Sequence, residues 1–118
     1  MYRYDKAIDI IISRFHKLAL VYKENSDYYE ELPYVFYESE FTNYIVSKIQ
    51  ENNELELKNI FDLIEDMLSN GDEGIVNLIE VSIIESLYYE ENYVDLKKMI
   101  YPLLGTVAKD KFDKLPKK

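Results

Sequence analysis

The sequence contains no cysteine, and this absence removes several kinds of chemistry. Without cysteine the chain has no disulfide framework, no thiolate zinc site and no thiol nucleophile. A cysteine-free chain suits a reducing cytoplasm, which is the location we expect. Glycine and proline are also scarce, with three of each in 118 residues. Because all-β folds need many tight turns, this scarcity favours an all-α fold.

Long apolar runs are missing as well. The strongest run, Ile10–Ile12, is flanked by Asp9 and Arg14, and it is far shorter than the roughly 18 apolar residues of a membrane span. The first six residues carry charges where the apolar part of a signal peptide would lie. We therefore expect neither a membrane partner nor a secretory signal.

Residues that would form a catalytic or metal site are few. His16 is the single histidine, so a di-metal helical bundle, which needs two Glu-x-x-His pairs, is excluded. The three glycines form no phosphate-binding loop. We expect no metal, no cofactor and no catalytic residue, and hence not an enzyme. One alternative stays open: Glu65 and Glu85 could face each other across two packed helices and do acid–base work or line a small-molecule pocket.

Negative charge dominates the middle of the chain. The net charge is −9, and residues 24–96 hold 19 Asp and Glu against only Lys48 and Lys58. The last 22 residues, 97–118, are basic, with seven Lys and two Asp. An acidic body repels nucleic acid and anionic membranes and attracts basic proteins. The alternative is that the charge serves solubility alone.

Apolar residues recur at helical spacing in five segments, which cover residues 5–23, 34–50, 54–69, 73–90 and 92–104. This pattern predicts an irregular bundle of about five helices, with α-solenoid-like helix pairs as the alternative architecture. Apolar residues surround nearly the whole circumference of segment 73–90, so we expect it to be the central, buried helix.

The boundaries of these segments carry signals of their own. Asn70 and Gly71 predict a left-handed stop after the third helix, and Asp72 predicts a cap for the fourth. Gly105 predicts the end of the last helix. We therefore expect a single all-helical domain over residues 1–105, followed by a basic C-terminal tail, 106–118. The tail either adds a short helix through Val107, Phe112 and Leu115 or frays, and we expect removal of residues 107–118 to leave the fold intact.

Tyrosine is unusually frequent, with 12 residues, and many lie beside carboxylates. Tyrosine gives a large, stiff contact area with a polar tip and is enriched at protein interfaces, while acidic neighbours steer a basic partner. The alternative is compositional, because tyrosine is also common in chains encoded by AT-rich genomes. The residues we predict to bind a protein partner are Tyr28, Tyr29, Glu30, Glu31, Glu38, Asp62 and Asp66.

Part of the sequence resembles a known family. The stretches 55–68, 70–73 and 76–87 combine a hydrophobic spacing with Ile-Glu pairs such as Ile64-Glu65 and Ile84-Glu85. In this respect the chain resembles small all-helical bacterial proteins that include immunity proteins of polymorphic or contact-dependent growth inhibition toxins. The resemblance implies a protein that neutralises a cognate, basic nuclease-type toxin by stoichiometric binding. The alternative is a non-catalytic adaptor or regulatory module in a bacterial operon.

Overall fold

The computed structural model describes residues 1–90 and 96–116, and in this part of the chain all regular elements are helical. The α-helices, in chain order, are α1 (Ala7–Arg14), α2 (His16–Glu24), α3 (Ser26–Tyr29), α4 (Pro33–Phe36), α5 (Thr42–Gln50), α6 (Glu54–Asn70), α7 (Glu73–Ile79), α8 (Glu85–Tyr88), α9 (Leu96–Ile100) and α10 (Thr106–Asp113). Short 3₁₀ turns precede α1 (Tyr4–Lys6) and follow α9 (Tyr101–Leu103). None of the described helices is long and apolar enough to cross a membrane.

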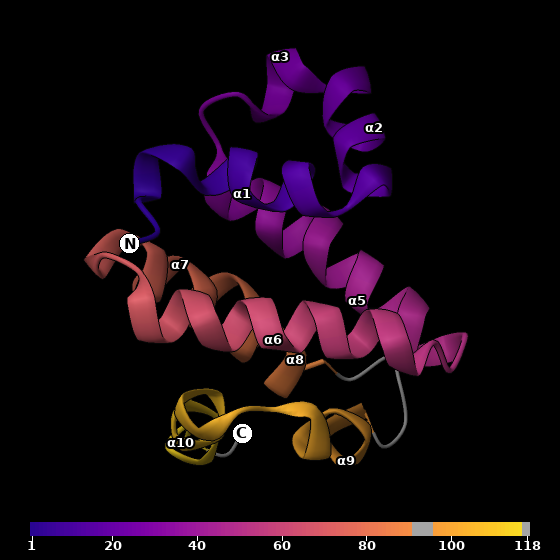
Figure 1. Cartoon of the computed structure of the whole chain (residues 1–118), viewed down its shortest axis with the longest axis vertical. Helices are drawn as coiled ribbons and strands as arrows, with labels where there is room; N and C mark the ends of the chain where they lie inside the picture. Colours follow the sequence, from indigo (N-terminus) through magenta and orange to yellow (C-terminus); the bar gives the residue numbers. More distant parts are fainter. Residues whose placement is uncertain (91–95, 117–118) are drawn as a thin grey trace.

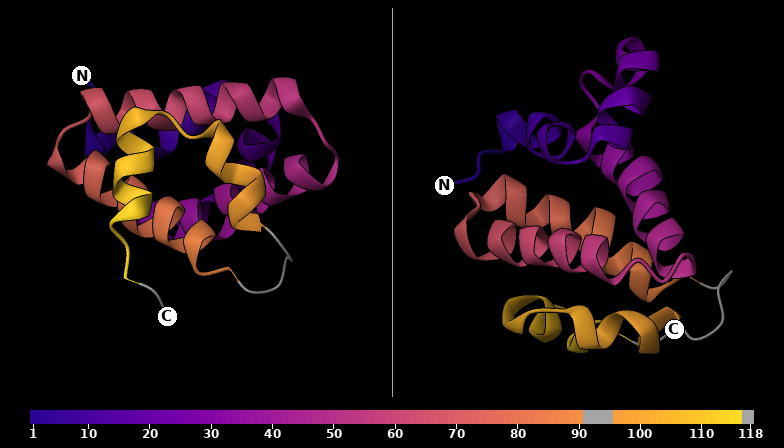
Figure 2. Two further views of the ribbon diagram at one scale, coloured as in Figure 1. Left: turned by 90° about the horizontal axis from the view of Figure 1, so that it is seen from below. Right: turned by 45° about the vertical axis from the view of Figure 1, so that its right-hand side comes forward.

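The helices are arranged in three tiers (Figures 1 and 2). The first tier contains α1 to α3, and the middle tier contains α6 beside α7 and α8. The helix that begins with α4 and ends with α5 runs down from the first tier to the middle one. The third tier contains α9 and α10, which lie on the other side of α6 and α8. The all-α prediction is therefore confirmed.

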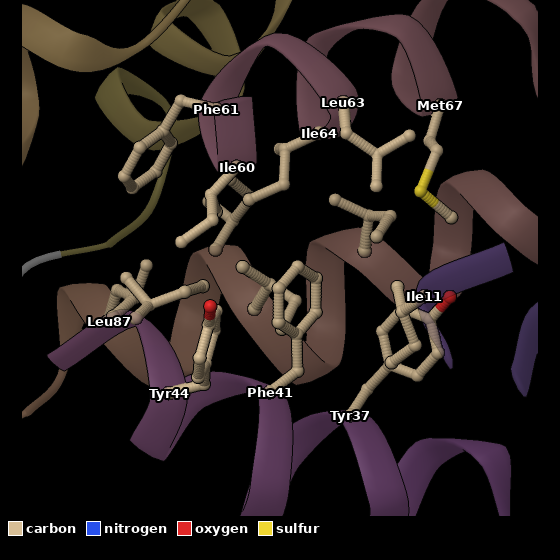
Figure 3. Packing of buried hydrophobic residues seen from close by; sticks show 14 of the residues in the cluster. Ile11, Tyr37, Phe41, Tyr44, Ile60, Phe61, Leu63, Ile64, Met67 and Leu87 are labelled. Carbon is tan, nitrogen blue, oxygen red and sulfur yellow. The ribbon is translucent and has the colours of Figure 1, made fainter. Parts of the chain in front are cut away.

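One cluster of buried side chains extends through all three tiers, from Ala7 in α1 to Phe112 in α10. Figure 3 shows Tyr37 and Phe41 pointing from the α4–α5 helix toward Ile60, Ile64 and Met67 of α6. All five side chains are fully buried, with no exposed surface. The Tyr37 hydroxyl donates a hydrogen bond of 2.6 Å to the carbonyl oxygen of Ala7, so this deep phenol has a polar partner.

The expected helix over residues 5–23 is interrupted at one residue. Phe15 has extended backbone angles, φ −124° and ψ 104°, and separates α1 from α2. Its buried ring packs against Phe41 and Tyr44, with both ring centroids 5.6 Å away. The spacing of apolar residues predicts the helices on both sides of Phe15 correctly. At Phe15 itself, tertiary packing of the aromatic ring overrides the local helix propensity. The helix expected at 54–69 is confirmed as α6.

Two of the expected helices contain a π-helical turn. One turn, Tyr37–Phe41, joins α4 to α5, and the other, Glu80–Ile84, joins α7 to α8. The two turns pack against each other, and the Thr42 hydroxyl, just after the first turn, donates to the carbonyl of Ser82 in the second at 3.2 Å. Such turns shift the helical register by one residue, which a 3.6-residue pattern does not reveal.

Segment 73–90 is less enclosed than its composition suggests. Ile79 and Ile83 are fully buried, whereas Val81 between them is 44% exposed. The helix therefore keeps one face toward solvent, and the expectation of a helix enclosed on all sides is wrong at this face. The start of the helix expected at 92–104 lies outside the described residues.

The turn between α6 and α7 is held by the N-terminus of the chain (Figure 1). The Tyr2 amide donates to the Asn70 carbonyl, and the Asp72 amide donates to the Tyr2 carbonyl, each at 2.9 Å. Gly71 is extended, with φ −93°, so the predicted left-handed stop is wrong. A side chain at position 71 would instead overlap the Ile75 side chain and the Met67 carbonyl. The predicted cap is confirmed, because the Asp72 carboxylate accepts from the Ile75 amide at 2.9 Å.

Residues 106–113, which we expected in a tail, form α10 and belong to the packed structure. Ala108 and Phe112 are buried, with exposed fractions of 1% and 5%. The carboxylate of Glu65 on α6 accepts hydrogen bonds from the amides of Val107 and Ala108, at 2.8 and 3.0 Å. This carboxylate satisfies amides that have no partner within α10. Of the two options for the tail, the short helix is therefore the one formed, and residues 106–113 pack with the rest of the described chain.

Several phenols make the fold sensitive to alkali. The hydrogen bond to Glu40 raises the pKa of Tyr29 to about 12, and burial raises the pKa of Tyr37 and of Tyr44 above the ordinary value of 10.0. The native state therefore keeps these protons at a pH where the unfolded chain loses them, so stability falls as pH rises.

We therefore expect the melting temperature to hold steady below pH 10 and to fall steeply from about pH 10 to 12. Thermal melts across this range, recorded with tyrosinate absorbance, measure the effect. Tyr37→Phe should flatten the decline. A melting temperature independent of pH across this window would show that the buried phenols ionise as easily as free ones.

Candidate functional site

An acidic groove runs along α6 beside the end of α1. Its volume is about 760 Å³. Buried Phe15 and Leu63 line it together with Arg14, the one cation among its described lining residues. Its polar lining residues on α6 are Glu56, Asn59, Asp62, Glu65, Asp66, Ser69 and Asn70. The groove thus combines four carboxylates with a single guanidinium, and it attracts cationic groups.

The polar lining follows from the amphipathic pattern of α6. The lining residues of α6 recur every three to four positions, at 56, 59, 62 or 63, 66 and 69 or 70. They therefore lie on one face of the helix. The opposite face supplies the core, through residues such as Ile60 and Ile64. Packing of that inner face fixes the backbone positions from which the outer carboxylates project.

Each carboxylate of the groove has a partner within the protein. Asp66 accepts from the Tyr2 hydroxyl at 2.5 Å, and this hydrogen bond lowers the pKa of Asp66. Glu56 accepts from the Tyr44 hydroxyl. Asp62 forms an ion pair with Lys58 at 2.6 Å, and both side chains are more than half exposed. Such an exposed pair contributes little to stability and opens readily to a competing cation.

A second, smaller hollow lies between the N-terminus, α2 and the α3–α4 connection. Its volume is about 380 Å³. Glu30 and Glu31 line it together with Asp5 and Asp9, beside the ring of Tyr22 and other lining residues. Its lining residues differ from those of the α6 groove.

The structure separates the seven predicted binding residues into different places. Asp62 and Asp66 lie together in the α6 groove. Glu30 and Glu31 line the second hollow, Glu38 is exposed on the π-helical turn, and Tyr28 is 62% exposed. These six side chains can therefore be reached by a partner protein.

Tyr29 differs from these six, because it is only 7% exposed and its hydroxyl donates to Glu40 at 2.6 Å. Tyr29 therefore belongs to the packed structure and leaves little of its ring for contact with a partner. Tyr37, Tyr44 and Tyr88 are likewise buried. Much of the tyrosine content thus serves the core.

Glu65 and Glu85 do not form the facing pair considered from sequence. Glu65 lines the α6 groove and binds the amides of α10. Glu85 lines a separate hollow of about 330 Å³, together with Glu80 and Lys111. Two carboxylates with different surroundings and no shared pocket cannot act on one substrate as a pair. In the described part of the chain, no group of three or more metal-binding side chains lies close enough to hold a metal ion.

Most residues that line the α6 groove were not predicted from the sequence. Asn59, Asp62 and Asp66 stand out as the polar side of α6, but Glu56, Ser69 and Asn70 continue the same spacing and could have been added. Arg14 could not, because its position depends on the break at Phe15 that brings the end of α1 to α6.

Fold and site together define a small all-helical domain with an acidic groove along its longest helix. The chain belongs to a family described as a domain of unknown function, DUF7674, which matches residues 8–117. Comparison with curated proteins and with solved structures finds no match.

Proposed function

We propose that this protein is a cytoplasmic immunity protein, which neutralises a basic toxin by stoichiometric binding through the α6 groove. The observation that carries the proposal is the composition of the groove, with four carboxylates and one guanidinium around an apolar floor. Toxin domains that cleave nucleic acid have basic substrate clefts, because the substrate is a polyanion. A matching acidic surface would cover such a cleft and block it without any chemistry.

The groove also fits the speed that such a protein needs. Complementary charge raises association rates well above those of neutral surfaces, so a toxin is captured soon after it appears. The net charge of −9 adds a long-range attraction for a basic partner. The sequence resemblance to immunity proteins points to the same function. Adaptor function is the alternative, since an adaptor could present the same groove.

Adding positive charge to the groove tests the proposal. The toxin neutralised by an immunity protein is expected to be encoded by the neighbouring gene directly upstream. We expect Asn59→Lys with Asp62→Lys to slow association with the product of that neighbouring gene by roughly 10-fold or more at low salt. Both side chains are exposed, so the variant should melt like the parent. The difference should shrink in about 0.15 M salt, which screens charges beyond roughly 8 Å. Association rates from surface-binding kinetics measure the effect.

Two further variants make the result specific to the groove. Glu30→Lys with Glu31→Lys makes a comparable charge change in the second hollow, and Lys114→Glu alters an exposed lysine of the third tier. We expect the groove variant to slow association more than either. A larger effect in the 30–31 variant would move the interface to the second hollow.

A further inference from the structure

The third tier carries an open hollow with a mainly apolar surface. Its volume is about 370 Å³, and it is lined by Lys97, Lys98, Tyr101, Pro102 and Phe112. Tyr101 is 37% exposed and Pro102 is also exposed, so apolar surface is left in contact with water. We call this feature the third-tier hollow. Burial of such a surface against another protein is favourable.

Lysine side chains at the third-tier hollow lie against aromatic rings. The Lys97 ammonium is 4.0 Å from the centroid of the Tyr88 ring, and the Lys109 ammonium is 5.4 Å from the centroid of the Tyr101 ring. The face of an aromatic ring attracts a cation without removing its charge. Asp113 accepts a hydrogen bond from the Tyr101 hydroxyl at 3.0 Å and offsets part of this positive charge. The hollow therefore offers an apolar surface beside a net positive charge.

An exposed leucine lies at the start of α6, at one end of the middle tier (Figure 1). Leu55 is 74% exposed, and among the described residues only the terminal Met1 has a large apolar side chain with a greater exposed fraction. In the turn before α6, Asn52 adopts a left-handed conformation with φ 55°, and Asn53 caps the helix. The buried face of α6 begins at Leu57, two residues later, so Leu55 points away from the core.

Carboxylates flank this exposed leucine. Glu54 precedes it and is exposed, and Glu51 in the same turn is 54% exposed and pairs with Lys48 at 3.1 Å. Glu56 follows it and accepts a hydrogen bond from the Tyr44 hydroxyl. The α5–α6 turn thus presents one apolar side chain in acidic surroundings.

The α5–α6 turn and the third-tier hollow complement each other. An apolar side chain among negative charges matches an apolar surface beside positive charges, and opposite charges favour approach and fix the register of a contact. Both features belong to the same chain, so a second copy of the protein always supplies the matching one. The sequence has the same division, with 19 Asp and Glu in residues 24–96 and seven Lys in residues 97–118.

We propose that this protein binds a second copy of itself, with Leu55 of one copy seated in the third-tier hollow of the other and Glu54 close to Lys97. The contact joins two different surfaces, so copies either close into a ring or add in a chain. The interface is small, and the net charge of −9 repels copies at long range. The association is therefore weak, with a dissociation constant of roughly 0.1–1 mM.

Removal of the leucine tests the contact at its centre. Sedimentation in about 0.15 M salt, which screens the long-range repulsion, measures the average mass as the concentration rises. We expect the parent to exceed the mass of one chain as it approaches about 1 mM. Leu55→Asp should weaken this association roughly 10-fold or more, the effect expected when a buried leucine is lost. Val81→Asp is the matched control, because it makes the same charge change at an exposed residue and should associate like the parent.

Engineered cysteines test the position of the contact. The chain has no cysteine of its own, so each variant carries a single thiol. We expect Leu55→Cys mixed with Pro102→Cys to form a disulfide-linked dimer under mild oxidation faster than either variant alone, because a disulfide requires Cα atoms within about 7 Å. Val81→Cys mixed with Pro102→Cys is the control and should form the dimer slowly. Equal rates in the two mixtures would contradict the contact.

Two results of the sedimentation experiment would overturn the proposal. One is a parent that remains a single chain at about 1 mM, which would assign the third-tier hollow to an acidic segment of another protein. The other is unchanged association of Leu55→Asp, which would place any contact between copies elsewhere. None of these measurements uses the neighbouring gene's product, so this inference and the immunity function can fail separately.

Discussion

Ile83→Asp should leave the protein unfolded at room temperature. Ile83 is completely buried in the π-helical turn that packs against the α4–α5 helix. An aspartate there would place an unpaired charge among apolar side chains, and would also remove the packing of the isoleucine. Each effect costs several kcal/mol, and a domain of this size is stable by only about 5–15 kcal/mol. Circular dichroism and thermal melting measure the outcome.

Val81→Asp is the matched control, since it lies two residues away on the same helix and is 44% exposed. We expect it to fold and to melt within a few degrees of the parent, because its carboxylate can remain in water. A cooperative melt of Ile83→Asp near the parent's temperature would show that residues 73–88 are not essential to the core.

Deletion of residues 106–118 should destabilise the protein strongly. The deletion removes buried Phe112, whose ring packs on Tyr88 with centroids 4.8 Å apart. Loss of a buried phenylalanine side chain alone typically costs about 3–5 kcal/mol. Glu65 also loses both amide partners on α10. We expect a large drop in melting temperature and in the denaturant midpoint.

Two single substitutions show where the stability resides. Phe112→Ala should reproduce much of the loss, whereas Lys114→Ala, at a side chain that is 75% exposed, should have little effect. If the deletion variant melts like the parent, α10 contributes nothing to the fold and the expectation of a dispensable tail is restored.

The sequence was most informative where local pattern and tertiary packing agree. Helix α6 has an uninterrupted apolar stripe and an asparagine cap at Asn53, whose side chain accepts from the Glu56 amide at 3.1 Å. Its range therefore follows from periodicity and capping. The all-α class follows from the same pattern repeated along the chain.

Prediction failed where a distant residue decides the local structure. The chain breaks at Phe15 because of aromatic neighbours on the α4–α5 helix. Gly71 is extended rather than left-handed where the backbone of distant Tyr2 bonds to Asn70 and Asp72 on either side of it. The sequence leaves residues 106–113 open to either a short helix or a frayed end, and the hydrogen bonds from their amides to Glu65 accompany the helix. None of these contacts can be read from spacing along the chain.

In the candidate site, too, local pattern predicts some features, and distant contacts determine the others. The carboxylates of α6 are evident from its polar face, but the groove exists only because the end of α1 lies beside them. Tyr29 looked like an interface residue because acidic residues flank it, yet its hydroxyl is directed to Glu40 inside the fold. For tyrosine, composition does not distinguish a core ring from an exposed one.

Co-expression with the product of the neighbouring gene is the decisive experiment for the immunity function. We expect the two proteins to purify as a complex of fixed stoichiometry, and cells to survive the neighbour's product only when this protein is present. We also expect Asn59→Lys with Asp62→Lys, although folded, to weaken both the complex and the protection. A neighbour that binds without being toxic would favour the adaptor function. If no neighbouring product forms a complex, the immunity function is refuted, and full protection by the groove variant would show that the α6 groove is not the interface.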